Sequence, residues 1–174
     1  MIEKLIKKNS IYKGRVLEFW CDDVALPNGA TAKREYVVHP GACAVLPFVD
    51  DSNIVLVKQF RYVINQITYE IPAGKIDVEE TPLKCAVREL EEETGYQAKK
   101  LDKMMSLYPS SAFSTELLHI FVAFDLQKGM NKPDEDEFVS TEIINFNDAL
   151  KMVKSGKITD SKTIIAVLNF SIDY

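Results

Sequence analysis

Apolar residues in alternating and continuous runs dominate the first half of the chain and predict strands. Residues 15–39 read RVLEFWCDDVAL, PNG and ATAKREYVVH. This is the pattern of a hairpin, because the Asn-Gly pair supplies the positive φ angles of a tight turn. A second strand, turn, strand pattern is formed by residues 42–49 and 53–60, and two more strands are predicted at residues 104–109 and 117–126.

Helical spacing of apolar residues appears in three later segments. The first begins near Thr81, a capping residue followed by proline, and ends at Gly95, which suits the left-handed closing position. Residues 147–156 and 159–170 each start with a cap residue and continue with helical spacing. Strands mixed with three helices predict a mixed sheet packed between helices.

The first predicted helix has an unusual charge distribution. On a helical wheel its apolar residues define one side, which we expect to be the core face: Leu83, Ala86, Val87 and Leu90. Three carboxylates, Glu89, Glu92 and Glu93, fall on the opposite side. Like charges at this spacing cost a few tenths of a kcal/mol per pair, so a merely solvated acidic face is tolerable. The alternative is that the carboxylates collect a hard divalent cation, which prefers oxygen ligands.

Composition and charge restrict the other possibilities. Of the 174 residues, 47% are hydrophobic, which is typical of a folded soluble protein. The net charge of −5 argues against a protein that coats nucleic acid. We expect one main domain, residues 41–174, preceded by a β extension, residues 1–40. No apolar run approaches the length of a membrane span, so we expect a cytoplasmic protein. The three cysteines, Cys21, Cys43 and Cys85, are read as buried free thiols.

The spacing around the acidic helix is more specific than the acidity alone. Nine residues fit the pattern G-x5-E-x7-R-E-U-x-E-E-x-G-U, where U is a bulky apolar or aromatic residue: Gly74, Glu80, Arg88, Glu89, Leu90, Glu92, Glu93, Gly95 and Tyr96. This pattern resembles the Nudix box of the Nudix hydrolase family. The resemblance implies an α/β fold, a Nudix α/β/α sandwich with a mixed sheet, here with an N-terminal antiparallel strand extension.

The resemblance also implies a set of roles for residues in and beside the box. The metal ligands would be Glu89, Glu93 and the backbone carbonyl of Ala73. Glu92 would be a ligand or catalytic support, and Arg88 would orient the carboxylates. Glu80 would support the ligands without binding the metal itself. The cofactor would be Mg²⁺, with Mn²⁺ as a substitute, and metal-activated water would attack a pyrophosphate.

Four further stretches are similar to the ADP-ribose pyrophosphatase branch of the family: QFR at 59–61, EIPAG at 70–74, YPSSAFSTE at 108–116 and DEDEFV at 134–139. By this resemblance Arg61 contacts the diphosphate or the terminal ribose, a task suited to a fork of N–H donors. The remaining substrate-binding residues in the main part of the chain would be Glu70, Gly74, Lys75 and Glu116.

The acidic stretch at 134–137 would be a loop that supplies the reaction. The resemblance maps a general base onto Glu135 and a further metal ligand onto Glu137. An acidic loop that is only solvated is the competing interpretation, and the choice among the four acidic residues stays open.

Relatives in this branch exchange N-terminal hairpins between two subunits, so the resemblance implies a homodimer with swapped N-terminal strands. Arg15 and Arg34 would then stack on the base of the substrate. The chain lacks the P-S-P-G often found at positions 109–112 and has Pro-Ser-Ser-Ala instead, which leaves nucleoside specificity less determined than the reaction.

The implied function is hydrolysis of ADP-ribose, or a related ADP-sugar, to AMP and ribose 5-phosphate. Two alternatives stay open: cleavage of GDP-mannose or another nucleoside-diphosphate sugar by the same residues, and a Nudix-fold sensor that binds such a ligand without cutting it. A sensor would not need every box carboxylate, and none is missing here. The expected partner is thus a small nucleoside-diphosphate sugar, with no nucleic acid and no membrane.

Overall fold

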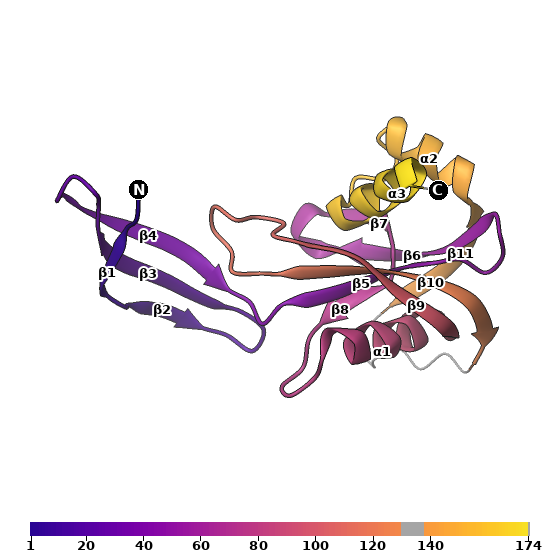
Figure 1. Ribbon diagram of the computed structural model, residues 1–174, viewed down its shortest axis with the longest axis horizontal. Coiled ribbons are helices and arrows are strands. Elements are labelled where there is room, and N and C mark those ends of the chain that lie inside the picture. Colours follow the sequence, from indigo (N-terminus) through magenta and orange to yellow (C-terminus); the bar gives the residue numbers. More distant parts are fainter. Residues whose placement is uncertain (130–137, 174) are drawn as a thin grey trace. The chain divides into compact units, whose positions relative to one another are not determined.

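The computed structural model describes residues 1–129 and 138–173, and the chain forms two compact units. The first, here the N-terminal unit, consists of Met1–Gly41 with Leu107–Leu117. The second, here the catalytic unit, consists of Ala42–Ser106 with Leu118–Tyr174. Figure 1 shows the elements of both units in chain order.

The N-terminal unit is an antiparallel sheet in which β3 is central. Its strands are β1 (Lys4–Lys7), β2 (Ser10–Lys13), β3 (Glu18–Ala25) and β4 (Thr31–Val38). β4 pairs with the whole of β3, whereas β1 and β2 pair with its two ends, so they share its other edge. The predicted hairpin is confirmed, with Gly29 at φ 85° in its turn. β1 and β2 were not anticipated.

The described part of the catalytic unit contains two sheets. Its strands are β5 (Ala42–Pro47), β6 (Asn53–Arg61), β7 (Gln66–Glu70), β8 (Ala73–Lys75), β9 (Tyr96–Leu107), β10 (Leu118–Lys128) and β11 (Val139–Asn145). One sheet has the order β8-β5-β10-β9 and is mixed, because β10 is parallel to β5 while β8 is antiparallel to it. The other has the order β11-β6-β7 and is antiparallel. A single 3-10 turn, Tyr62–Ile64, links β6 to β7.

Among the residues that the structure describes, three helices enclose these sheets, as the sequence predicted. They are α1 (Pro82–Thr94), α2 (Phe146–Lys154) and α3 (Ser161–Asp173). In Figure 1, α1 lies on one side of the strands of the catalytic unit, and α2 and α3 lie on the other. The α/β/α arrangement with a mixed sheet is therefore confirmed. No helix within the described ranges has both the length and the apolar character that a bilayer crossing requires.

The core between α1 and the mixed sheet is apolar and tightly closed. Its buried members come from β5, α1 and β10: Cys43, Val45, Cys85, Ala86, Leu90, Phe121 and Ala123. Burial of this surface fixes α1 against β5 and β8. The expectation that all three cysteines are buried is wrong for Cys21, which is only half-buried because it lies on β3 of the thin N-terminal sheet.

Candidate active site

Local signals position α1 at both ends. Thr81 caps the helix, and its Oγ1 accepts a hydrogen bond from the backbone N–H of Lys84 at 3.3 Å. Pro82 occupies the first helical position, where its missing N–H costs nothing. Gly95 closes the helix at φ 72°, a conformation that glycine adopts without steric cost. The predicted bounds of this helix are confirmed.

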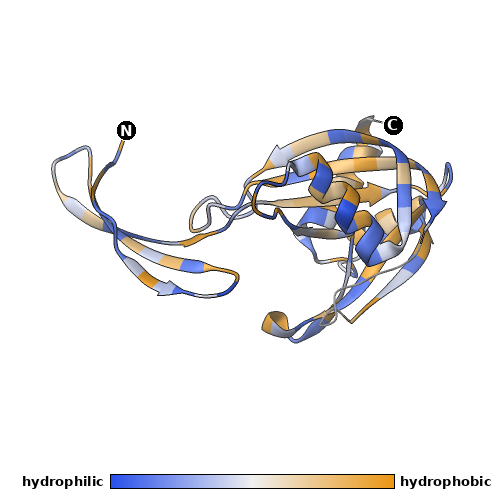
Figure 2. Ribbon diagram, turned by 90° about the horizontal axis from the view of Figure 1, so that it is seen from below, coloured by the Kyte–Doolittle hydropathy of each residue, from blue (hydrophilic) through white to orange (hydrophobic). Residues whose placement is uncertain are grey.

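The buried face of α1 is not the one expected from hydropathy. Leu83 and Val87 are 51% and 45% exposed, whereas Glu89 and Glu93 are only 8% and 4% exposed. The assignment of Leu83 and Val87 to the core face is therefore wrong. The helix is rotated so that Glu89 and Glu93 join the side that packs on the mixed sheet. Figure 2 shows hydrophobic as well as hydrophilic residues on the outward side of α1.

β8 creates the space that these two carboxylates occupy. Gly74 of β8 is paired with Cys43 of β5 and faces Glu89. A β-carbon built on Gly74 would lie 1.9 Å from Glu89 Oε1, so no larger residue fits without moving the carboxylate. The neighbouring Ala73 donates its backbone N–H to Glu93 Oε2 at 3.1 Å. The Ala73-Gly74 segment thus hydrogen-bonds Glu93 and leaves space for the carboxylate of Glu89.

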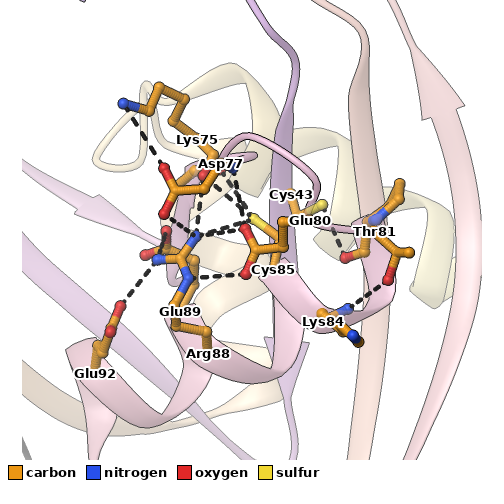
Figure 3. A network of polar contacts seen from close by, with 12 residues as sticks. Cys43, Lys75, Asp77, Glu80, Thr81, Lys84, Cys85, Arg88, Glu89 and Glu92 are labelled. Atoms are coloured by element: carbon orange, nitrogen blue, oxygen red, sulfur yellow. Dashed lines mark hydrogen bonds and ion pairs between the residues drawn. The ribbon is translucent and has the colours of Figure 1, made fainter.

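Arg88 links four oxygen-bearing groups around this site (Figure 3). Its Nε and Nη2 donate to the two carboxylate oxygens of Glu80 at 3.0 and 2.9 Å. Its Nη1 donates to Glu89 Oε1 at 2.6 Å and to Glu92 Oε2 at 3.0 Å, and Nη2 also donates to the carbonyl of Lys75 at 3.0 Å. A planar guanidinium suits this task because its donors have fixed directions.

The electrostatic effect of this network is clear in two groups. The bidentate contact with Arg88 lowers the pKa of Glu80 to about 2. The same contact, together with Glu89 and Glu92, raises the pKa of Arg88 above its usual range. One guanidinium shared among three carboxylates leaves the site with surplus negative charge, and a divalent cation would compensate it.

The donor set fits a hard divalent cation. Glu89 and Glu93 are one helical turn apart on one face and lie beside the Ala73-Gly74 backbone, and hard divalent cations prefer such carboxylate oxygens. Within residues 1–129 and 138–173, no three His, Cys, Asp or Glu side chains are already gathered in metal-binding geometry. Glu135 and Glu137, expected as general base and further ligand, lie outside the described residues.

A cleft of about 460 Å³ in the catalytic unit contains two of the expected substrate-binding residues, Arg61 and Glu70. Arg61 donates from Nε and Nη2 to the two oxygens of Glu70 at 2.7 and 2.6 Å. Hydrogen bonding to Glu70, opposed by burial, raises the pKa of Arg61, and the charge of Glu93 adds to this increase. The Arg61 side chain therefore lies near enough to Glu93 of the box for their charges to interact.

Sequence reasoning missed two further charged residues that line this cleft, Asp160 and Lys162 at the start of α3. Lys162 contacts the carboxylate of Glu70, which lies 92 residues earlier in the chain. The segment TDSKT was interpreted only as a helix start, and no local pattern indicates a partner so far away in sequence. Lys75, predicted to bind substrate, is exposed, and its Nζ lies 3.9 Å from Asp77 Oδ1.

The other three predicted substrate-binding residues belong to the N-terminal unit. Arg15 is exposed in a bend before β3, and Arg34 forms a bidentate ion pair with Glu3 through Nε and Nη2. Glu116 is half-buried, and its backbone N–H donates to Ser114 Oγ at 3.1 Å. Their roles toward a substrate remain predictions.

Comparison with known proteins agrees with the box and the fold. The family model described as NUDIX domain matches residues 38–166. Over 167 residues, 95% of this chain and 90% of each relative, the chain is 47% identical to an ADP-ribose pyrophosphatase of Bacillus subtilis and 46% identical to a methanol dehydrogenase activator of Bacillus methanolicus. A solved structure titled as an ADP compounds hydrolase shares the fold, with a TM-score of 0.88, 20% identity, and coverage of 99% of this chain and 94% of that one.

The chain therefore belongs to the Nudix family, and the resemblance found from the box is confirmed. Hydrolases of this family generally use divalent metal cations, in keeping with the oxygen donors of α1 and β8. The family match and the identity to the relatives show that the chain is a Nudix hydrolase.

Proposed function

We propose that this chain is a metal-dependent ADP-ribose pyrophosphatase that hydrolyses ADP-ribose, or a closely related ADP-sugar, to AMP and ribose 5-phosphate. The observation that carries the reaction type is the burial of Glu89 and Glu93 on the side of α1 that faces Ala73 and Gly74. The substrate is supported by the 47% identity to a protein named ADP-ribose pyrophosphatase, together with Arg61 in the neighbouring cleft.

Each residue of the site has a task in this reaction. Glu89 and Glu93, with the Ala73 carbonyl, would hold Mg²⁺, for which Mn²⁺ would substitute. A cation held there would lower the pKa of a water and offset negative charge on the phosphoryl oxygens. Arg88 holds the carboxylates of Glu89 and Glu92 in place. Glu80 in turn fixes Arg88 from the other side.

Substrate contact falls to the cleft residues. Arg61 would donate to the anionic diphosphate or to the terminal ribose, with Glu70 fixing its orientation. The water oxygen forms a bond to one phosphorus while the bond from that phosphorus to the bridging oxygen breaks. We assign the general base to Glu135 and a further metal ligand to Glu137, following the family resemblance, and both lie outside the described residues.

A panel of substrates tests this proposal. Purified protein with Mg²⁺ is expected to release AMP from ADP-ribose faster than it releases GMP from GDP-mannose or UMP from a UDP-sugar, and EDTA is expected to stop the reaction. A preference for GDP-mannose would instead favour GDP-mannose cleavage. Another relative, from Salmonella typhimurium, is named GDP-mannose pyrophosphatase. Binding without any turnover would select the sensor.

We also propose a homodimer formed through the N-terminal unit. The side chains of β1 and β2 are all exposed, and they include Leu5, Ile6, Ile11 and Tyr12 at 54 to 65% exposure. Exposed apolar residues concentrated on two adjacent strands are typical of a protein interface. A second copy that exchanges this unit would cover them and would bring Arg15 and Arg34 to the partner's substrate.

Light scattering of the purified chain tests the assembly. The chain is expected at twice its 19.7 kDa mass, and the double substitution Ile6→Glu with Ile11→Glu is expected to shift it to the monomer. A wild-type monomer at micromolar concentration contradicts the dimer and leaves the proposed reaction type unaffected.

We place the working protein in the cytoplasm, as composition and the free thiols suggest.

A further inference from the structure

The start of α3 is joined to the strand that carries Glu70. Asp160 Oδ2 accepts the backbone N–H of Thr163 at 3.0 Å and its hydroxyl at 2.6 Å, so Asp160 caps the helix. The same Thr163 Oγ1 accepts the backbone N–H of Ile71 at 2.8 Å. These contacts tie α3 to the segment that leads from Glu70 into Ala73.

Lys162 completes this junction with a charge. Its Nζ donates to Glu70 Oε2 and to Asp160 Oδ1, the latter at 2.9 Å. The side chain of Lys162 is 14% exposed and that of Glu70 is 4% exposed, so neither ion is fully solvated. Buried ions need well-placed partners, because desolvation removes several kcal/mol of hydration from each.

The contact between Lys162 and Glu70 reaches Arg61 through a shared oxygen. Glu70 Oε2 accepts from both Lys162 Nζ and Arg61 Nη2, while Glu70 Oε1 accepts from Arg61 Nε and from Thr68 Oγ1. The carboxylate therefore has a fixed rotation that matches the two donors of Arg61. Arg61 itself is 43% exposed and lines the cleft of about 460 Å³.

The charges of this cluster balance only when Lys162 is present. Arg61 and Lys162 contribute two positive charges, and Glu70 and Asp160 contribute two negative charges. Loss of the Lys162 charge would leave one surplus negative charge on the wall of a cleft where a diphosphate is expected to bind. It would also free Glu70 to rotate away from the Arg61 fork.

We propose that Lys162 is a positioning residue for substrate binding: it holds the Glu70 carboxylate against Arg61 and so fixes the Arg61 guanidinium toward the anionic diphosphate in the cleft. This inference rests on the proposed function. It assigns to α3 a role in substrate affinity, whereas the metal-binding residues of α1 and β8 govern turnover.

Steady-state kinetics with ADP-ribose and saturating Mg²⁺ test the role of Lys162. Lys162→Met is expected to raise KM by about 10-fold or more while kcat changes less than about 3-fold, because it removes one partner of the buried charge pair that holds Arg61 and leaves the carboxylates of Glu89 and Glu93 unchanged. Lys162→Arg, which keeps the charge, is expected to recover most of the affinity. Lys151→Met is the matched control, since Lys151 pairs with Asp148 on exposed α2, and it is expected to leave KM unchanged.

A double-mutant cycle separates positioning from a structural role. If Lys162 acts through Arg61, adding Lys162→Met to Arg61→Ala should raise KM little beyond the effect of Arg61→Ala alone. If the KM increases of the two single variants multiply in the double variant, the inference is overturned. An unchanged KM in Lys162→Met overturns it too. A fall in stability without a change in KM also overturns it, because α3 anchoring alone would then explain the contacts.

Two further outcomes are a Lys162 variant that does not fold and a wild-type chain that is inactive toward ADP-ribose. If Lys162→Met does not fold, Lys162→Gln, which retains a neutral donor, is measured in its place with the same criteria. If the wild-type chain neither cleaves nor binds ADP-ribose, the proposed function and this inference fall together. If the wild-type chain cleaves it and the Lys162 variants match the wild type, only the inference falls.

Discussion

Gly74 and Glu89 approach each other so closely that a side chain at position 74 would displace the Glu89 carboxylate. A β-carbon at position 74 would lie 1.9 Å from Glu89 Oε1 and 2.1 Å from Glu89 Cδ. The carboxylate is the far end of a flexible chain, so it would move rather than the backbone. Glycine at this position therefore reserves the space in which Glu89 presents its oxygens.

Gly74→Ala is expected to lower metal-dependent turnover on the order of 100-fold, because a displacement of about 1 Å at a catalytic group has that effect. Turnover as a function of Mg²⁺ concentration measures the change. The control is Gly156→Ala: Gly156 has φ +74° and open space around it, so alanine there should cost about 1 kcal/mol of stability and leave turnover unchanged. Wild-type turnover in Gly74→Ala would contradict this account of the glycine.

Glu93→Gln is expected to abolish Mg²⁺-dependent turnover, with a fall of at least about 100-fold, while the chain stays folded. The amide oxygen can still accept the Ala73 N–H, but it no longer carries the charge that attracts a cation. Turnover and direct Mn²⁺ binding measure both effects. Glu91→Gln is the matched control, since Glu91 contacts Gln97 rather than the box. Equal metal affinity in Glu93→Gln and wild type would exclude Glu93 as a ligand.

Arg88→Lys is expected to raise the pKa of Glu80 from about 2 toward its ordinary 4.5, because a lysine cannot donate to both carboxylate oxygens at once. A carboxylate whose pKa is lowered by folding adds stability above pH 4.5, and this contribution is lost as pH falls toward 2. The stability difference between wild type and variant should therefore be largest above pH 4.5 and shrink below it. Urea unfolding between pH 2 and 6 tests this, and a difference independent of pH would contradict it.

Glu70→Gln tests the ion cluster beside α3. Burial raises the pKa of Glu70, but hydrogen bonds from Arg61, Lys162 and Thr68 outweigh it, and the pKa falls to about 2. The difference from 4.5 corresponds to about 3 kcal/mol, at about 1.4 kcal/mol per pKa unit. The variant is thus expected to be less stable by about that amount above pH 4.5 and nearly as stable as wild type near pH 2.

Urea unfolding of Glu70→Gln and wild type at several pH values measures this difference. The control variant is Glu142→Gln, because Glu142 is 48% exposed and lies 4.0 Å from Lys58. An exposed pair of this kind contributes little, so its stability should stay within about 0.5 kcal/mol at every pH. A loss in Glu70→Gln as small as that of the control would show that the buried cluster adds no stability.

Features that depend on neighbours in sequence were predictable. The ends of α1 follow from Thr81, Pro82 and Gly95, since capping involves hydrogen bonds and φ angles within a few residues. The hairpin of β3 and β4 follows from its Asn-Gly turn for the same reason. The box itself is a spacing pattern on one helix and the strand before it, so the family could be identified from the sequence.

Short strands with few buried side chains were missed. β1 and β2 are exposed at every position, so no alternation of hydropathy marks them. β8 has three residues, and its pairing with β5 joins segments about thirty residues apart. Such strands exist because a partner strand completes their hydrogen bonds, and the partner cannot be read from the segment itself.

The sequence alone identified the family of this protein, because the residue types and spacing of the box all lie on one helix and the segment before it. Tertiary structure decided which side of that helix is buried: β8 offers a glycine at Gly74, and Glu89 and Glu93 enter the space that Leu83 and Val87 were expected to fill. It also brought Lys162 to Glu70 across 92 residues. Long-range packing selects such partners by shape and charge, and neither is encoded within a local window.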